Sequence, residues 1–267
     1  MAEPGTIALG PTQLALAALL LVAPTAISFG LKLGLEKKLV WAGVRTVAQL
    51  ALVGLILEWV FALDRWFYVV PVLVAMLGMA ARAAINRTAR EIPGSRMFAF
   101  GSLVLATTTV CFVTTETVIG VDPWYKPQYV IPLLGMLLGN GLNGISLSLD
   151  RLLEDLLGRR EAIEARLSLG ATVWVAVLPW MRQAVRTGMI PIINSMMIVG
   201  LVSLPGMMTG QILAGAEPRG AVAYQILIMF MICCSTALGT IMLCLLAFWR
   251  LRHPEARVRW EIIEEKN

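Results

Sequence analysis

The stretch GLVSLPGMMTGQILAG, residues 200–215, carries no charge and is apolar enough to lie within a membrane. Two helix breakers, Pro205 and Gly206, nevertheless lie near its centre. Proline has no backbone N–H, so within a helix the carbonyl of Leu201 would lose its usual partner. In hydrocarbon such a break is tolerated only where protein or a water-filled cavity satisfies the freed group. The stretch therefore predicts a broken membrane helix that faces an interior or a pathway.

The composition of the whole chain points to the membrane as well. Of its 267 residues, 58% are hydrophobic and only 15% are charged, and the mean hydropathy is +0.78. A soluble domain of this size would need more charge to cover its surface. We therefore predict an all-α polytopic membrane protein, in which residues 1–267 form one transmembrane domain.

The apolar runs predict about seven transmembrane helices, because each crossing needs about 20 residues. These runs cover approximately residues 7–29, 39–63, 66–85, 97–119, 128–149, 188–214 and 221–249. Most of the 22 basic residues fall in the connections after the first, third and fifth runs and in the C-terminal tail. Cytoplasmic loops carry such an excess of Lys and Arg, so we predict an external N-terminus and a cytoplasmic C-terminus. This topology explains the net charge of +5 without nucleic acid.

The connection between the fifth and sixth runs, about residues 150–187, is the only sizeable segment predicted outside the membrane. Five leucines recur there at helical spacing and predict an amphipathic continuation of the fifth span, with Asp155 and Arg159 as an i,i+4 ion pair. A second short helix is predicted from about residue 160 to 169, ending at Gly170. Such helices either lie on lipid headgroups or dock a cytoplasmic partner. The five leucines are Leu149, Leu152, Leu153, Leu156 and Leu157.

The end of this connection resembles the coupling motif of ABC-transporter permeases, in which a Glu-Ala-Ala stretch is followed by a glycine and, further on, a proline. Arg166 stands here where the motif has its second alanine, and Leu178-Pro179 follows at a loose spacing. The chain has no G-x-x-x-x-G-K-[ST] phosphate loop, so ATP and Mg²⁺ would bind a separate ATPase, and we expect no cofactor on this chain. The predicted ATPase-coupling residues are Glu164, Ala165, Arg166, Leu167, Ser168, Leu169, Gly170, Ala171 and Thr172.

Four blocks together resemble the Fet-type ABC-transporter permease family of iron exporters. They are LEKKLVWAGVRTVAQL (35–50), VIPLLGMLLGNGLN (130–143), ARLSLGATVW (165–174), and residues 200–215 followed by AVAYQILIMFMI (221–232). The resemblance implies a permease of the inner (plasma) membrane that works with a cytoplasmic ATPase, exports iron and supports metal homeostasis and oxidative-stress resistance. Plant relatives with these blocks are linked to aluminium tolerance and UDP-glucose transport, so another cargo stays open. Since an ABC permease needs two membrane halves, we expect a homodimer.

Polar and sulfur-bearing side chains inside the spans are the candidate pathway residues. Charged and amide groups in a membrane usually face a bundle interior or a cavity. The alternatives are that Arg45 extends to the headgroups and that the asparagines serve helix packing. The predicted pathway set is Arg45, Gln49, Asn140, Asn143, Ser203, Met207 and Met208.

The broken span also supplies the predicted gate, a hinge made of Leu201, Pro205, Gly206 and Gly210. Met207 and Met208, with Glu116 near the outer end of the fourth span, are the candidate metal ligands. The simpler alternatives are that the methionines fill gaps in the packing and that Glu116 faces outer water.

Other classes of function fit less well. An ion-gradient-driven secondary transporter also uses broken helices, but we find no internal repeat of the kind such proteins carry. An intramembrane enzyme is disfavoured, because the single histidine, His253, lies in the tail and no catalytic set accompanies it. We therefore predict a non-enzymatic transport subunit.

Overall fold

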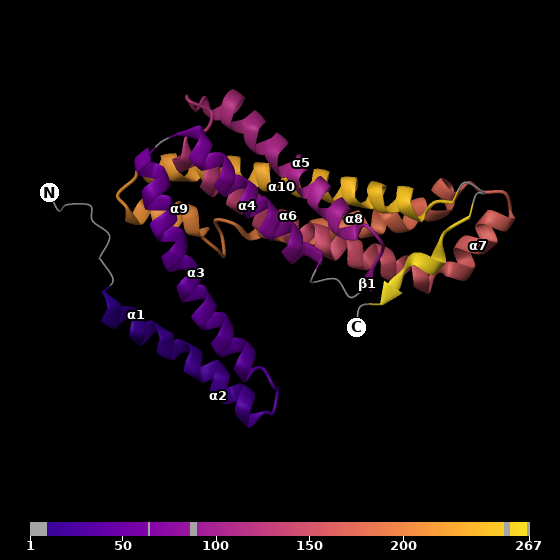
Figure 1. Ribbon diagram of the computed structural model, residues 1–267, viewed down its shortest axis with the longest axis horizontal. Helices are drawn as coiled ribbons and strands as arrows, with labels where there is room; N and C mark the ends of the chain where they lie inside the picture. The colour runs from indigo at the N-terminus through magenta and orange to yellow at the C-terminus, as the bar shows by residue number, and fades with distance from the viewer. Residues whose placement is uncertain (1–9, 64, 86–89, 254–256, 266–267) are drawn as a thin grey trace.

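The computed structural model describes residues 10–63, 65–85, 90–253 and 257–265, and almost all of them are helical (Figure 1). The elements are, in chain order, α1 (Pro11–Ala18), η1 (Leu19–Leu21), α2 (Val22–Gly30), α3 (Glu36–Leu63), α4 (Trp66–Ile85), β1 (Arg90–Glu91), α5 (Ser95–Val113), η2 (Thr114–Ile119), α6 (Pro127–Gly158), α7 (Arg160–Ser168), α8 (Val173–Ile198), α9 (Gly206–Leu213), α10 (Pro218–Leu251), η3 (Trp260–Ile262) and β2 (Glu264–Glu265). The only sheet among these residues is the two-residue antiparallel pair β1–β2. The predicted all-α fold is confirmed.

Within the described residues, five helical segments are long and apolar enough to cross a membrane. The shorter apolar helix Trp66–Ala80 adds a sixth. These six correspond to the predicted spans other than the sixth, so the chain is a polytopic membrane protein. The five long segments are Pro11–Gly30, Glu36–Leu63, Ser95–Ile119, Pro127–Gly158 and Pro218–Leu251.

The prediction of a sixth span over residues 188–214 is wrong, because this region is not one kinked helix but parts of two separate helices. Helix α8 begins at Val173, well before the expected start at residue 188, and ends at Ile198. Residues 199–205 are not helical, and α9 begins only at Gly206. The turn out of α8 passes through Gly200 with a φ of +82°, a conformation that glycine adopts without strain. Proline at 205 therefore precedes a helix and does not kink one, so the predicted loss of a helical bond at Leu201 does not occur.

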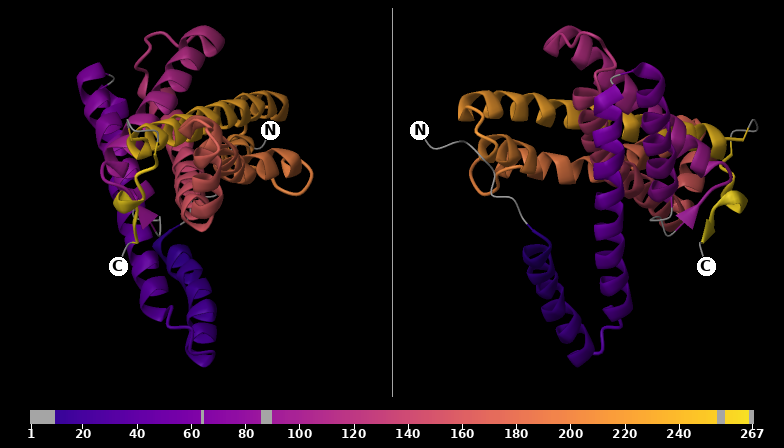
Figure 2. Two further views of the ribbon diagram at one scale, coloured as in Figure 1. Left: turned by 90° about the vertical axis from the view of Figure 1, so that its right-hand side faces the viewer. Right: turned by 60° about the vertical axis from the view of Figure 1, so that its left-hand side comes forward.

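The helices form a bundle with a projecting arm (Figures 1 and 2). Helices α4, α5, α6, α8 and α10 pack against one another, and α9 packs against α10. Segments α1 to α2 fold back along α3 and form the arm with it. Ser28 closes the turn of the arm, because its hydroxyl donates to Glu36 (2.7 Å) and accepts from the backbone N–H of Leu35 (3.1 Å).

The core of the bundle is the crossing of α6, α8 and α10. Gly144 and Gly188 meet there with almost no space between their backbones. A Cβ added to Gly188 would clash with the Ser148 hydroxyl and lie 2.6 Å from the Gly144 carbonyl oxygen. A Cβ on Gly144 would lie 2.5 Å from Thr236 and 3.0 Å from the Gly188 carbonyl oxygen. Small residues of this kind let membrane helices approach closely, and here they fix the depth at which α8 crosses its neighbours.

Helix α6 continues beyond the membrane-length segment, as the leucine spacing predicted. Four of the five leucines of the extension are almost fully buried in the bundle, which disfavours the alternative of a helix lying on headgroups. The predicted ion pair is wrong: Asp155 pairs with Arg151 (2.9 Å), and the Arg159 guanidinium lies 5.6 Å from the centre of the Trp180 ring.

We predict that Gly188→Ala lowers the stability of the folded protein by about 1 to 3 kcal/mol, the range typical of overpacking a tight core. Thermal unfolding of the purified protein in nanodiscs measures this loss. Gly139→Ala on α6 is the matched control, because an added Cβ there meets nothing within 4 Å. Equal melting temperatures for the two variants would contradict the close crossing.

Candidate coupling surface and transport pathway

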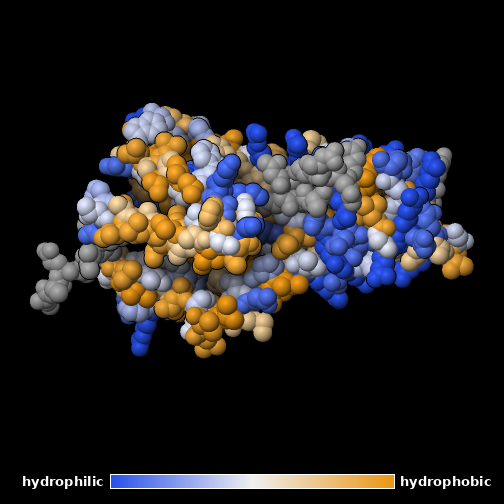
Figure 3. Space-filling view, turned by 90° about the horizontal axis from the view of Figure 1, so that it is seen from below, coloured by the Kyte–Doolittle hydropathy of each residue, from blue (hydrophilic) through white to orange (hydrophobic). Residues whose placement is uncertain are grey.

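The short helix α7 lies at one end of the bundle, at the same end as the paired strands β1 and β2 (Figure 1). Figure 3 shows hydrophilic residues gathered at this end, whereas hydrophobic residues cover much of the remainder of that face. Strand β1, the connection that holds α7, and residues 257–265 of the tail all meet here. The sequence analysis predicts that these basic segments are cytoplasmic. The turn of the arm is also basic and predicted to be cytoplasmic, but it does not lie at this end of the bundle.

Helix α7 ends where the sequence predicted. Gly170 has a φ of +88°, and its N–H donates to the Leu167 carbonyl (2.9 Å). The next N–H, of Ala171, donates to the Arg166 carbonyl (3.0 Å). This paired arrangement closes a helix C-terminus around a left-handed glycine. Thr172 then caps α8 by accepting from the Val175 N–H (3.3 Å), so only a few residues separate the two helices.

The two sides of α7 differ sharply. Ile163 is fully buried and anchors the helix on the bundle. Leu169, the residue directly after the last turn of α7, is 88% exposed. Leu169 is thus open to contact by another protein. The geometry makes α7 a short knob with a rigid base and an apolar tip.

The C-terminal tail clamps α7 from the side, a feature that the sequence reasoning missed. The indole N–H of Trp260 donates to Glu164 Oε1 (2.5 Å), and the Arg160 guanidinium lies 5.5 Å from the centre of the same indole ring. Residues 264–265 pair antiparallel with residues 90–91, which fastens the tail to the segment before α5. The one signal in the sequence was an aromatic residue within a charged tail.

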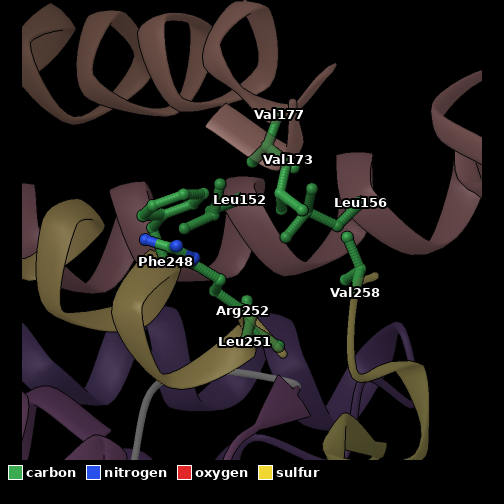
Figure 4. Close-up of a pocket in the computed structure, with 8 residues that line it drawn as sticks. All are labelled: Leu152, Leu156, Val173, Val177, Phe248, Leu251, Arg252 and Val258. Atoms are coloured by element: carbon green, nitrogen blue, oxygen red, sulfur yellow. The ribbon is translucent and has the colours of Figure 1, made fainter. Parts of the chain in front are cut away.

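A crevice at the same end holds the tail in place (Figure 4). Val258 of the tail is almost fully buried in it, and the Arg252 backbone forms an antiparallel bridge with Val258. Trp174 on α8 makes an edge contact with Phe248, with ring centroids 5.1 Å apart. The tail thus covers the ends of three bundle helices. The lining residues are Leu152, Leu156, Val173, Val177, Phe248, Leu251, Arg252 and Val258.

The predicted pathway residues of α3 and α6 are not brought together in one copy of the chain. Arg45 and Gln49 are exposed on the arm. Asn140 and Asn143 are exposed on α6, where the Asn140 amide donates to the Met136 carbonyl (2.9 Å). The arm projects away from the bundle, and spacing within each helix could not reveal this separation.

The broken segment divides its predicted residues between two environments. Ser203 is exposed in the connection, whereas Met208 is buried and Met207 is half-buried and packs against the core of the bundle. Glu116 is exposed on η2, at the outer end of α5. No group of three or more His, Cys, Asp or Glu side chains is placed to hold a metal ion among the described residues. A metal role for Met207, Met208 and Glu116 stays a prediction.

Comparisons with known proteins give this arrangement a family context. The sequence profile of "Uncharacterised protein family (UPF0014)" matches residues 11–251. A UPF0014 membrane protein of Synechocystis is 45% identical, over 78% of this chain and 81% of its own length. The "Probable iron export permease protein FetB" of Escherichia coli is 34% identical, over 90% of this chain and 93% of its own. "Protein ALUMINUM SENSITIVE 3" of Arabidopsis thaliana is 30% identical, over 83% and 80%. No solved structure matches.

We predict that Trp260→Ala loosens α7, because the helix loses its hydrogen bond to the tail and its ring contact with Arg160. Hydrogen exchange of the α7 amides should become faster, and Trp260→Phe, which keeps a ring but no N–H, should give a smaller change. Trp41→Ala, at an exposed position on α3, is the control and should leave α7 unchanged. Unaltered α7 protection in Trp260→Ala would refute the clamp.

Proposed function

Since this chain belongs to the UPF0014 family of membrane proteins, we propose that it is the permease subunit of an ABC transporter of the inner (plasma) membrane. In this proposal it exports iron or a metal complex, and a separate cytoplasmic ATPase that binds ATP and Mg²⁺ supplies the energy. The family match covers most of the chain, and a relative named a probable iron export permease aligns along nearly its whole length.

The observation that carries the proposal is the form of α7. An ATPase that moves as a rigid body can act on a membrane protein only through a part that does not deform under load. Helix α7 has a buried anchor at Ile163, a closed glycine end at Gly170 and a clamp at Trp260. Its apolar tip, Leu169, is exposed for insertion into a cleft of the ATPase.

Helix α8 supplies the route from this contact to the predicted gate. It is continuous over 26 residues, so it extends about 39 Å from the coupling motif to the connection at residues 199–205. A helix packed tightly against α6 and α10 transmits a displacement at one end to its other end. In this proposal, the gate residues Leu201, Pro205, Gly206 and Gly210 respond to motion of the ATPase.

The cargo and the assembly follow from the same reasoning. One copy of the chain supplies one membrane half, so the complete transporter is a homodimer that binds two ATPase subunits and sits in membrane lipid. Iron is the favoured cargo because of the relative's name. Another cargo, such as a sugar nucleotide, would leave ATP dependence intact, whereas an ion-gradient-driven transporter would work without an ATPase.

We predict that Glu164→Lys and Gly170→Trp each abolish most of the stimulation of the partner ATPase by the permease in nanodiscs. The first variant reverses a charge that the clamp uses, and the second forces a large side chain into a left-handed backbone position. Glu217→Lys, before α10, is the control for the charge reversal and should keep normal stimulation. The proposal fails if tagged protein captures no ATPase and transport needs no ATP.

We predict that Pro205→Ala and the double variant Met207→Leu/Met208→Leu both reduce the rate of ATP-dependent iron transport across the membrane of proteoliposomes. Proline fixes the backbone where α9 begins, and leucine removes sulfur while keeping the apolar volume. Met79→Leu, at an exposed position on α4, is the matched control. Normal export in all variants would disprove the gate, and loss in Pro205→Ala alone would disprove only the role of the sulfur atoms.

A further inference from the structure

Helix α3 touches the bundle at one end only. Among its described residues Val60 alone is buried, near the C-terminal end of the helix, where it packs with Val69 of α4 and Ile131 of α6. From that contact α3 runs away from the bundle and does not lie alongside α6 (Figures 1 and 2). Segments α1 to α2 cover one side of α3, where a Cβ added to Gly43 would lie 2.7 Å from Leu21. The other sides of α3 are open.

The open side of α3 carries a cation and an amide within a membrane span. Arg45 and Gln49 are both exposed, and their spacing of four residues places them on one face of the helix. That face points away from Gly43, because two residues along a helix turn the direction by about 200°. An arginine within a span normally faces a bundle interior or a cavity. In the structure, Arg45 faces neither.

Helix α6 has an open face of complementary chemistry. It packs against α4, α5, α8 and α10, yet one side of it stays exposed. An added Cβ at Gly139 meets nothing within 4 Å, so another helix can approach closely there. Asparagine offers a side-chain carbonyl acceptor, whereas arginine offers five N–H donors and no acceptor. The exposed residues on this side are Pro132, Gly139, Asn140, Asn143 and Leu147.

The polar side chains of the two helices lie at matching depths. Helices α3 and α6 are the second and fifth spans of the chain, so they cross the membrane in opposite directions. Their contact at Val60 and Ile131 gives a common starting point. The polar residues of α3 lie about 22 and 16 Å along the helix from Val60, and the asparagines of α6 about 18 and 14 Å from Ile131. The level pairs are Arg45 with Asn143 and Gln49 with Asn140.

The bilayer favours an arrangement that brings these pairs together. Both α3 and α6 are long and apolar enough to cross a membrane. Spans are tilted from the bilayer normal by about 20° on average, so neighbouring spans run roughly side by side. A swing of α3 about its Val60 end would bring it alongside α6 in that orientation. Segments α1 to α2 lie on the far side of α3 from Arg45, so they do not obstruct the swing.

We propose that in the membrane the arm closes onto α6 by pivoting at Val60, so that α3 covers the open face of α6. In the closed form the Arg45 guanidinium donates to the side-chain carbonyl oxygen of Asn143, and the Gln49 amide donates to that of Asn140. Four polar side chains that the open form keeps apart then make one cluster inside the bundle. This inference goes beyond the proposed function, because it requires neither an ATPase nor a particular cargo.

Cysteine cross-linking in native membranes tests the closure with the full-length chain. Cys233 and Cys234 are first replaced by serine, and the other two cysteines are buried. Val53→Cys is then combined with Gly139→Cys, which lies at about the same distance from the pivot, or with Leu238→Cys, an exposed position on α10 that serves as the control. Copper phenanthroline should produce several-fold more intramolecular disulfide in the first pair. Peptide mass spectrometry identifies the bond, and gel mobility separates it from a covalent dimer.

A second set of variants tests the polar contact. Arg45→Leu and Asn143→Leu, each added to the Val53→Cys/Gly139→Cys protein, should lower the yield of the disulfide several-fold, because leucine forms no hydrogen bond. Arg219→Leu, at an exposed position at the start of α10, removes a charge elsewhere and should leave the yield unchanged.

The outcomes decide between the closed arm and its alternatives. Equal disulfide yields in the α6 and α10 pairs would overturn the closure. A covalent dimer in place of the intramolecular bond would show that the arm covers a second copy, and would also overturn it. An undiminished yield in both Arg45→Leu and Asn143→Leu would overturn the polar contact that is proposed to hold the arm. None of these measurements involves ATP or iron, so failure of the closure leaves the proposed function intact.

Discussion

The close crossing of α6 and α8 at Gly144 and Gly188 is the constraint on which the other parts of the structure depend. Each glycine leaves just enough room for the backbone of the other helix, and Thr236 of α10 fills the remaining side. Because a side chain at either position would push the helices apart, α8 is held at one depth against α6. That position places α7, which precedes α8, at the hydrophilic end, and the connection at residues 199–205 at the opposite end of α8.

A fixed crossing also gives α8 a mechanical role in the proposed function. In the proposed function, α8 acts as a lever that is held near Gly188, although Pro179 and Pro191 interrupt the backbone hydrogen bonds within it. The anchor, the closed glycine end and the tail clamp all stiffen the end that carries α7. The other end has the opposite character: α8 stops at Ile198, and an irregular turn with Gly200 leads to α9. The molecule is rigid where a partner would push and irregular where a gate would open.

Local chemistry explains which parts of this arrangement could be predicted from the sequence. The bounds of α4 and the end of α7 were predicted because apolar length and a glycine stop are local signals. The helix–turn–helix around residue 200 was not, since Pro205 suits a kinked helix and the residue before a new helix equally well. The contact of Trp260 with Glu164 joins positions far apart in the chain, and no periodicity reveals it. The separation of Arg45 from Met208 likewise depends on how the arm leaves the bundle.

The most direct test of the account is a pair of distance measurements in the reconstituted complex with its ATPase. Spin labels at Ala162→Cys report the separation of the two α7 helices in the proposed homodimer. Labels at Val202→Cys report the separation of the two copies of the connection at residues 199–205. The account predicts that trapping the ATPase with vanadate changes both distances together. A change at Ala162 with no change at Val202 would contradict the lever, and no response to ATP at either position would contradict the permease function itself.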